Sequence, residues 1–174
     1  MADGTYLLDS DVFMAAKNLY YSFDICPGFW KSIVHHHRKG DVFSIDRIRQ
    51  EIFAGDDTEE LVKWVKNEIP KEFFHSTKTD RVVSAYIEIM SWVQQNPQYF
   101  LQAKEDFARG ADGWLVAFAR VEAITVITNE ESAPNSRRSI KLPDVCNRFE
   151  VRCENTFSML RSLNIHFDWV ESSG

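Results

Sequence analysis

The stretch that decides the fold is Tyr6-Leu7-Leu8-Asp9-Ser10-Asp11, in which a short apolar run is followed by two carboxylates around a serine. An apolar run this short predicts a strand that is buried on both faces rather than a helix. Asp9 then stands at the carboxyl end of this strand, where open α/β sheets place their ligands. The segment 12–17, which comes next, predicts a helix.

The length and composition favour one globular domain over residues 1–174, with a large aromatic core. No apolar run approaches the ~20 residues that a membrane span needs, and no basic segment before an apolar stretch marks a signal peptide. Cys26, Cys146 and Cys153 are too few and odd in number for a disulfide scaffold, and no CxxC pair indicates a thiolate zinc site. We therefore expect a cytoplasmic protein without membrane contact.

The charge balance does not by itself indicate a nucleic-acid partner. The formal net charge is −6, whereas nucleic-acid-binding proteins usually show a basic balance. The bases are nevertheless concentrated in the segment 137–152, which holds five Lys or Arg residues against two acids. Because the local field matters more than the total charge, a basic surface can exist on this acidic protein.

Periodicity and capping residues predict the remaining elements. Gly40 is expected to end a helix that begins at Pro27, Ser44 to cap the helix that follows it, and Asp57 to open another with Glu60 reaching back. The β-branched segment 124–128 is the clearest strand, and 132–138 is a polar, flexible loop. Further helices are expected at 79–96, 99–110, 112–119, 142–146 and 155–163, and weaker strand signals lie at 41–44, 73–74 and 151–153. Strands that alternate with helices indicate an α/β domain with a mainly parallel sheet.

Four acidic residues occupy places that can converge in such a fold. Asp9 and Glu130 follow strands, Asp112 opens a helix, and Glu51 lies beside the apolar stripe of its helix. Each has an ordinary explanation, such as an N-cap for Asp112 and a solvated helix position for Glu51. If they converge, their repulsion requires a cation between them. Oxygen ligands without cysteine or ordered histidine select Mg²⁺ or Mn²⁺, which typically serve phosphoryl chemistry.

The order of these motifs resembles a known family. The segment 6–13 is similar to the opening motif of PIN domains, the fold of VapC-type toxin ribonucleases, with Asp11 where asparagine is usual. Glu51, the segment 112–119 and the strand that ends in Glu130 resemble the later motifs, although aspartate is commoner at the last position. The segments Phe23–Trp30 and Lys141–Cys146 are similar to a PIN-like subfamily long catalogued as a domain of unknown function.

The resemblance implies a three-layer α/β/α PIN-like domain with a mainly parallel central sheet. It further implies that Asp9, Glu51, Asp112 and Glu130 hold one or two Mg²⁺ or Mn²⁺ ions and hydrolyse RNA phosphodiesters, leaving a 5′-phosphate. It also implies a toxin role with a cognate antitoxin, and similar toxins commonly form homodimers.

Two further groups of residues would serve this chemistry. The resemblance implies that three residues beside the metal ligands orient the ligand carboxylates by hydrogen bonding; these are Ser10, Asp11 and Thr128. The basic residues that are candidates to contact RNA are Arg137, Arg138 and Lys141.

Two other interpretations compete with the nuclease. Asp9-Ser10-Asp11 also resembles the aspartyl-phosphate motif of haloacid-dehalogenase-like phosphatases. That motif has Thr or Val at the position of Phe13, and the sequence offers no clear downstream acidic pair at a strand end to hold Mg²⁺. Such an enzyme would form a covalent phospho-Asp9. The second alternative is a non-catalytic PIN-like module that binds RNA or protein. The presence of all four acids argues against it, because a buried acidic cluster without a function would only destabilise the fold.

Overall fold

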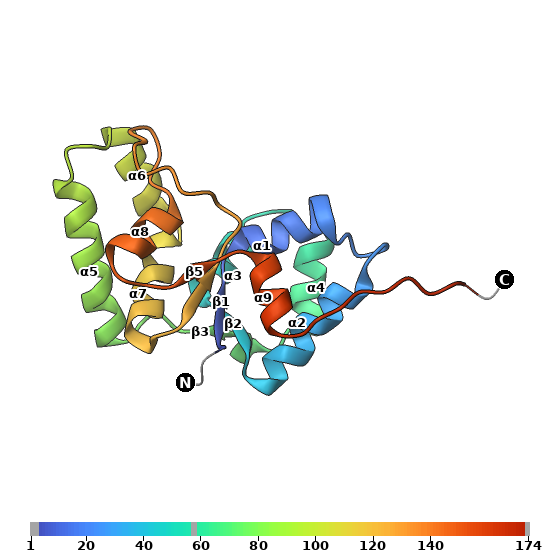
Figure 1. The fold of residues 1–174 in the computed structure, drawn as a ribbon. Coiled ribbons are helices and arrows are strands. Elements are labelled where there is room, and N and C mark those ends of the chain that lie inside the picture. The colour runs from blue at the N-terminus through green and yellow to red at the C-terminus, as the bar shows by residue number, and fades with distance from the viewer. Residues whose placement is uncertain (1–3, 57–58, 173–174) are drawn as a thin grey trace.

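Five short parallel strands form the central sheet of the computed structural model, which describes residues 4–56 and 59–172 (Figure 1). In space they follow the order β3-β2-β1-β4-β5, and every pair of neighbours is parallel. The strands are β1 (Tyr6–Leu8), β2 (Val42–Ile45), β3 (Phe74–His75), β4 (Thr125–Ile127) and β5 (Cys153–Glu154). The predicted α/β/α architecture with a parallel sheet is confirmed.

The helices cover both faces of this sheet. Helices α5 to α8 lie on one side of it, and α2, α4 and α9 lie on the other (Figure 1). None of the helices in the described ranges is both long and apolar enough to cross a membrane. Their bounds are α1 (Ser10–Ala15), continued by a π-helical turn at Ala16–Tyr20, α2 (Pro27–Lys39), α3 (Asp46–Phe53), α4 (Glu60–Glu68), a 3₁₀ turn at Lys71–Phe73, α5 (Asp80–Gln95), α6 (Leu101–Arg109), α7 (Asp112–Glu122), α8 (Leu142–Arg148) and α9 (Thr156–Ser162).

The order of the strands reverses beside β1. The chain moves outward from β1 to β2 and β3, and then returns to place β4 and β5 on the other side of β1. Leu8 of β1 is in register with Ile127 of β4, and the Asp9 amide donates a hydrogen bond to the Ile127 carbonyl at 3.0 Å. The carboxyl ends of β1 and β4 therefore meet at the switch point, the usual ligand position in an open parallel sheet.

One predicted cap was wrong and another cannot be placed. Ser44 does not cap α3; it lies fully buried within β2, and its hydroxyl donates to the Leu8 carbonyl at 2.6 Å. Ile45 precedes α3 without any side-chain cap. The tertiary partner on β1 outweighed the local capping preference of serine. The predicted cap Asp57 lies outside the described residues, and α4 begins at Glu60.

Other predicted helix ends are confirmed. Gly40 follows α2 with a φ of 85°, the left-handed conformation that glycine adopts without strain. Thr79 caps α5 through its hydroxyl, which accepts a hydrogen bond from the Val82 amide, and Asn155 caps α9 in the same way. These ends could be predicted because the groups that make them lie within a few residues of one another.

Helix α7 is held close against α5. Most of its residues from Gly113 to Ala119 are buried, and a Cβ at Gly113 would lie 3.0 Å from the Tyr86 ring of α5, so only glycine fits without movement. The Trp114 ring stacks on Tyr86 with centroids 3.7 Å apart, and the Arg47 guanidinium lies 4.4 Å from the Trp114 centroid. This packing fixes the first residue of α7, Asp112, beside the switch point.

Candidate active site

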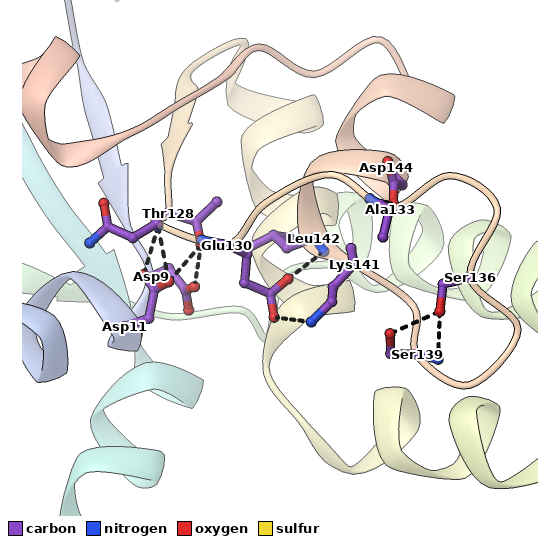
Figure 2. Close-up of polar contacts among 11 residues, drawn as sticks. Asp9, Asp11, Thr128, Glu130, Ala133, Ser136, Ser139, Lys141, Leu142 and Asp144 are labelled. Atoms are coloured by element: carbon purple, nitrogen blue, oxygen red, sulfur yellow. Dashed lines mark hydrogen bonds and ion pairs between the residues drawn. The ribbon is translucent and has the colours of Figure 1, made fainter.

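Asp9 lies buried at the end of β1, with only 5% of its surface exposed. Its Oδ1 accepts a hydrogen bond from the Ser10 amide at 2.7 Å. Its Oδ2 accepts one from the Thr128 hydroxyl at 2.8 Å, as Figure 2 shows. Thr128 follows β4, so the parallel register brings the two together. The Ser10 hydroxyl is 3.5 Å from Asp9, which is long for a hydrogen bond, so Ser10 serves Asp9 mainly through its backbone.

Asp11 shares the Thr128 hydroxyl with Asp9. The Thr128 Oγ1 lies 3.1 Å from the Asp11 Oδ2, and the Asn129 amide donates to both oxygens of Asp11 at 2.9 and 3.1 Å. A hydroxyl has one hydrogen and can donate to only one carboxylate at a time. The second contact is therefore favourable when a carboxyl carries a proton or when a cation lies beside it.

Asp112 completes a set of three carboxyl groups, which we call the aspartate group (Asp9, Asp11 and Asp112). Asp112 is the first residue of α7 rather than its N-cap, which is Ala111, so the predicted capping role is wrong. The charge of Asp112 acts on Asp9, and that of Asp11 acts on Asp112. Of the four acids predicted to converge, Asp112 therefore acts electrostatically on Asp9, and Glu51 and Glu130 act on Asp112; Asp11 was not one of the four.

Glu51 and Glu130, which we call the glutamate pair, each contact the start of a helix. The Oε1 of Glu51 accepts a hydrogen bond from the Ala111 amide at 2.9 Å, before α7. The Oε2 of Glu130 accepts one from the Leu142 amide of α8 at 2.8 Å, and its Oε1 lies 3.9 Å from the Lys141 ammonium (Figure 2). Each glutamate thus has positively polarised partners of its own.

Burial raises the pKa of all three members of the aspartate group, and repulsion adds to the rise at Asp9 and Asp112. Burial raises the pKa of Asp9 well above its usual range, and the charges of Asp11 and Asp112 raise it further. Burial also raises the pKa of Asp11, against the hydrogen bonds from Asn129 and Thr128. The pKa of Asp112 is raised to about 7, first by burial and then by Glu130, Glu51 and Asp11. Carboxyl groups in such a state gain from a proton or from a cation.

The carboxyl groups suit a divalent metal ion by their chemistry but not by their present positions. All five carboxyl groups offer hard oxygen ligands, which suits Mg²⁺ or Mn²⁺. Within residues 4–56 and 59–172, however, no three His, Cys, Asp or Glu side chains stand in an arrangement that could hold a metal ion. The glutamate pair is turned toward helix N-termini instead. The donor set therefore fits a divalent cation, whereas the ligand geometry requires side-chain movement.

A pocket of about 180 Å³ opens beside these groups. It is lined by Asp112 and Glu130, by residues of α6, and by the loop before α8, including Arg138 and Lys141. Of the three predicted RNA contacts, Arg138 and Lys141 therefore lie at the acidic pocket. Arg137 points elsewhere, with its guanidinium 4.7 Å from the Phe100 ring centroid.

Three residues near the site had no assigned role in the sequence. Asn129 binds Asp11 through its amide, and its place directly after a predicted strand end was the available signal. The thiols of Cys146 on α8 and Cys153 on β5 hydrogen bond to each other, which raises the pKa of Cys146 and lowers that of Cys153. Asp9 and Asp112 add to the rise at Cys146, so the thiols lie near the aspartate group. No spacing rule predicts that contact.

Comparison with known proteins agrees with this fold. The chain is similar to a chain of the FitAcB crystal structure from Neisseria gonorrhoeae, with 16% identity, a TM-score of 0.55, and coverage of 88% of this chain and 99% of that one. It is also similar to a chain of VapBC2 from Rickettsia felis bound to a DNA fragment from their promoter, with 12% identity, a TM-score of 0.51, and coverage of 87% and 98%.

The search of curated proteins finds no match. A family model described as a domain of unknown function, DUF4411, matches residues 6–167. At such low identities the structural matches establish the fold, which is PIN-like, and the family model establishes membership. The chain belongs to the DUF4411 family.

Proposed function

We propose that this protein is a Mg²⁺- or Mn²⁺-dependent endoribonuclease that hydrolyses RNA phosphodiesters at the aspartate group. One observation carries the proposal: Asp9 and Asp11 share the Thr128 hydroxyl at the switch point of a parallel sheet, and the charge of Asp112 acts on Asp9. None of these three aspartates has a lysine or arginine ion pair among the described residues. A divalent cation bound there would supply charge neutralisation for the scissile phosphate and a lower pKa for an attacking water.

The residues of this chain have separate tasks in the proposal. Asp9 and Asp112 are direct ligands, since burial and neighbouring charges destabilise their ionised forms most strongly. Thr128 holds the Asp9 carboxylate in place through its hydroxyl. Glu51 and Glu130 position α7 and α8 through the amides of Ala111 and Leu142, and either could bind the metal only after its side chain had left that amide.

We further propose that the nuclease is the toxin of a toxin–antitoxin pair. The VapC-type resemblance of the sequence and the likeness to a chain of VapBC2 support this role. A pocket of about 430 Å³ offers a docking place for the antitoxin; it is lined by the rings of Phe23, Trp30 and Trp64. Lys31, His35 and Arg38 lie along its α2 edge and Glu68 of α4 lies in the same lining, so its cationic side chains outnumber its one carboxylate. This balance suits an antitoxin segment with apolar and acidic side chains.

The direct test is cleavage of total bacterial RNA by the purified protein and by an Asp9→Ala variant, with Mg²⁺, Mn²⁺ or EDTA, followed by mapping of the new ends. We expect metal-dependent cleavage that leaves 5′-phosphates and that the variant loses. A Lys31→Glu, Arg38→Glu double variant should cleave normally but escape inhibition by the antitoxin.

The other outcomes separate the alternatives. Absence of both cleavage and Mn²⁺ binding would refute the nuclease and favour a non-catalytic module. A phosphorylated Asp9, detected by mass spectrometry after incubation with a phosphate ester, would favour the phosphatase instead.

A further inference from the structure

The loop between β4 and α8 is fixed by hydrogen bonds, although its composition predicted a flexible segment. The Gln98 side-chain amide donates to the carbonyls of both Pro134 and Ser136, each at 2.7 Å. The Phe100 amide donates to the Arg137 carbonyl at 2.9 Å. The backbone on the N-terminal side of Arg138 therefore has a defined position at the rim of the acidic pocket.

Two adjacent arginines of this loop have different surroundings. The Arg137 guanidinium lies over the Phe100 ring, and its Nε donates to the Gln98 carbonyl at 3.3 Å. The exposed Arg138 lines the pocket with Asp112 and Glu130, yet within the described ranges its guanidinium has no hydrogen bond, ion pair or ring contact. Arg137 is engaged in holding the loop, whereas Arg138 keeps all of its donors available.

The unpaired guanidinium of Arg138 indicates that this residue does more than offset the negative charge of the carboxylates in the pocket. Lys141 shows how a base offsets an acid at this site, because its ammonium lies 3.9 Å from Glu130. A base whose only task was to offset the carboxylates would form a similar pair. An unpaired guanidinium presents a planar fork of donors that matches two oxygens of a phosphate.

A nucleic-acid backbone can approach this acidic protein only beside a cationic side chain such as the Arg138 guanidinium. The net charge of −6 and the aspartate group repel polyanions, so a nucleic acid approaches only where a local cation offsets that repulsion. Arg138 is an unpaired base at the mouth of the pocket that holds Asp112.

We propose that Arg138 binds a backbone phosphate of single-stranded RNA next to the cleaved bond, while Arg137 only holds the loop. The inference rests on the proposed function in that the ligand is RNA, but it concerns binding and does not require turnover. The two arginines form a matched pair, since they are neighbours with the same charge and differ only in their contacts.

The test measures binding of a fluorescent single-stranded RNA of about twelve nucleotides by anisotropy, over a range of salt concentrations and in EDTA. We expect Arg138→Gln to weaken binding about tenfold and to reduce the log–log salt slope by about 0.7, as for one lost phosphate contact on a single strand. Its Tm should equal that of the wild type. Arg137→Gln should lower the Tm and change the salt slope little.

Each other result overturns the assignment. An Arg138→Gln variant with wild-type affinity and salt slope shows that no phosphate contact exists there. Equal losses in both variants, without a fall in the Tm of Arg137→Gln, show that the two arginines have the same role. If the wild type binds no RNA, the Arg138 proposal fails; if it binds RNA through Arg138 but never cleaves it, only the nuclease proposal fails.

Discussion

The aspartate group and the glutamate pair contain the same functional group at the same edge of the sheet, yet they are stabilised differently. Each glutamate accepts a backbone amide at the start of a helix, and Glu130 also has Lys141 beside it. The aspartates have raised pKa values, through burial in all three and through neighbouring carboxylates at Asp9 and Asp112. The difference teaches that acidic residues at one edge of a sheet are not equivalent: the glutamates accept hydrogen bonds from helix starts, whereas the aspartates are held in surroundings that raise their pKa values.

The largest effect should come from Asp112→Asn. The neutral amide removes a buried, repelled charge, so we expect the metal-free Tm to rise by about 3 °C or more. Stabilisation by Mn²⁺ should disappear, and RNA cleavage should fall by more than about 100-fold, beyond the 10–100-fold typical of outer-shell partners. Thermal unfolding with and without Mn²⁺ checks the first two effects.

A matched control for this variant is Asp106→Asn. Asp106 lines the same pocket but has its own partners, Gln102 and Arg109, so its loss should leave the Mn²⁺ response intact. An unchanged Mn²⁺ response in Asp112→Asn would remove Asp112 from the site.

The next effect should come from Thr128→Val, which deletes the hydroxyl that donates to Asp9 and keeps the shape of the side chain. We expect Mn²⁺ affinity or cleavage to fall by about 10–100-fold, because the carboxylate loses its orienting partner. Titration of Mn²⁺ against the Tm measures this.

Thr156→Val is the control, since Thr156 is also buried but its hydroxyl has no hydrogen-bond partner in the described part of the chain. Equal losses of Mn²⁺ affinity in the two variants would mean that the Thr128 hydroxyl has no special role.

The pH dependence of stability should distinguish the metal-free from the metal-bound protein. The pKa of Asp112 is about 7 in the folded state, against an ordinary value near 4 in the unfolded chain. Between these values the native state binds more protons, so the free energy of unfolding falls as the pH rises from about 4 to 7. The metal-free Tm should therefore decrease by several degrees from pH 5 to pH 8, and saturating Mn²⁺ should flatten the slope. A metal-free Tm that rises over this range would contradict the assigned shift.

The smallest effect should come from substitution of Glu51. Glu51→Gln keeps a carbonyl oxygen that can accept the Ala111 amide, whereas Glu51→Ala loses it and should cost about 1 kcal/mol, as for a lost helix cap. Urea unfolding of the two variants measures the difference. If both variants are destabilised equally, the carboxylate charge rather than the hydrogen bond supports α7.

The Mn²⁺ response of Glu51→Gln answers a separate question. If the Tm of this variant still rises with Mn²⁺ as in the wild type, Glu51 belongs to the frame and not to the ligand set.

Several features of this protein could be predicted from the sequence because their causes are local. The apolar run before Asp9 and the β-branched segment before Thr128 predicted β1 and β4, since short buried runs favour strands. Asn155 predicted a helix start because a capping side chain bonds an amide only two or three residues away, and periodicity placed another start near Thr79. The order of the acidic motifs carried the resemblance to PIN domains, and the PIN-like fold that this resemblance implied is confirmed.

The tertiary structure alone decided what each polar group contacts. Ser44 has a capping sequence but bonds Leu8 across the sheet, and Glu51 reaches an amide sixty residues away at Ala111. Arg137 and Arg138 are the same residue type in adjacent positions, and only the fold gives one a partner while the other has none among residues 4–56 and 59–172. The physical reason is that a side chain binds whichever partner the packed chain brings within about 3 Å, and contacts between distant segments leave no periodic trace in the sequence.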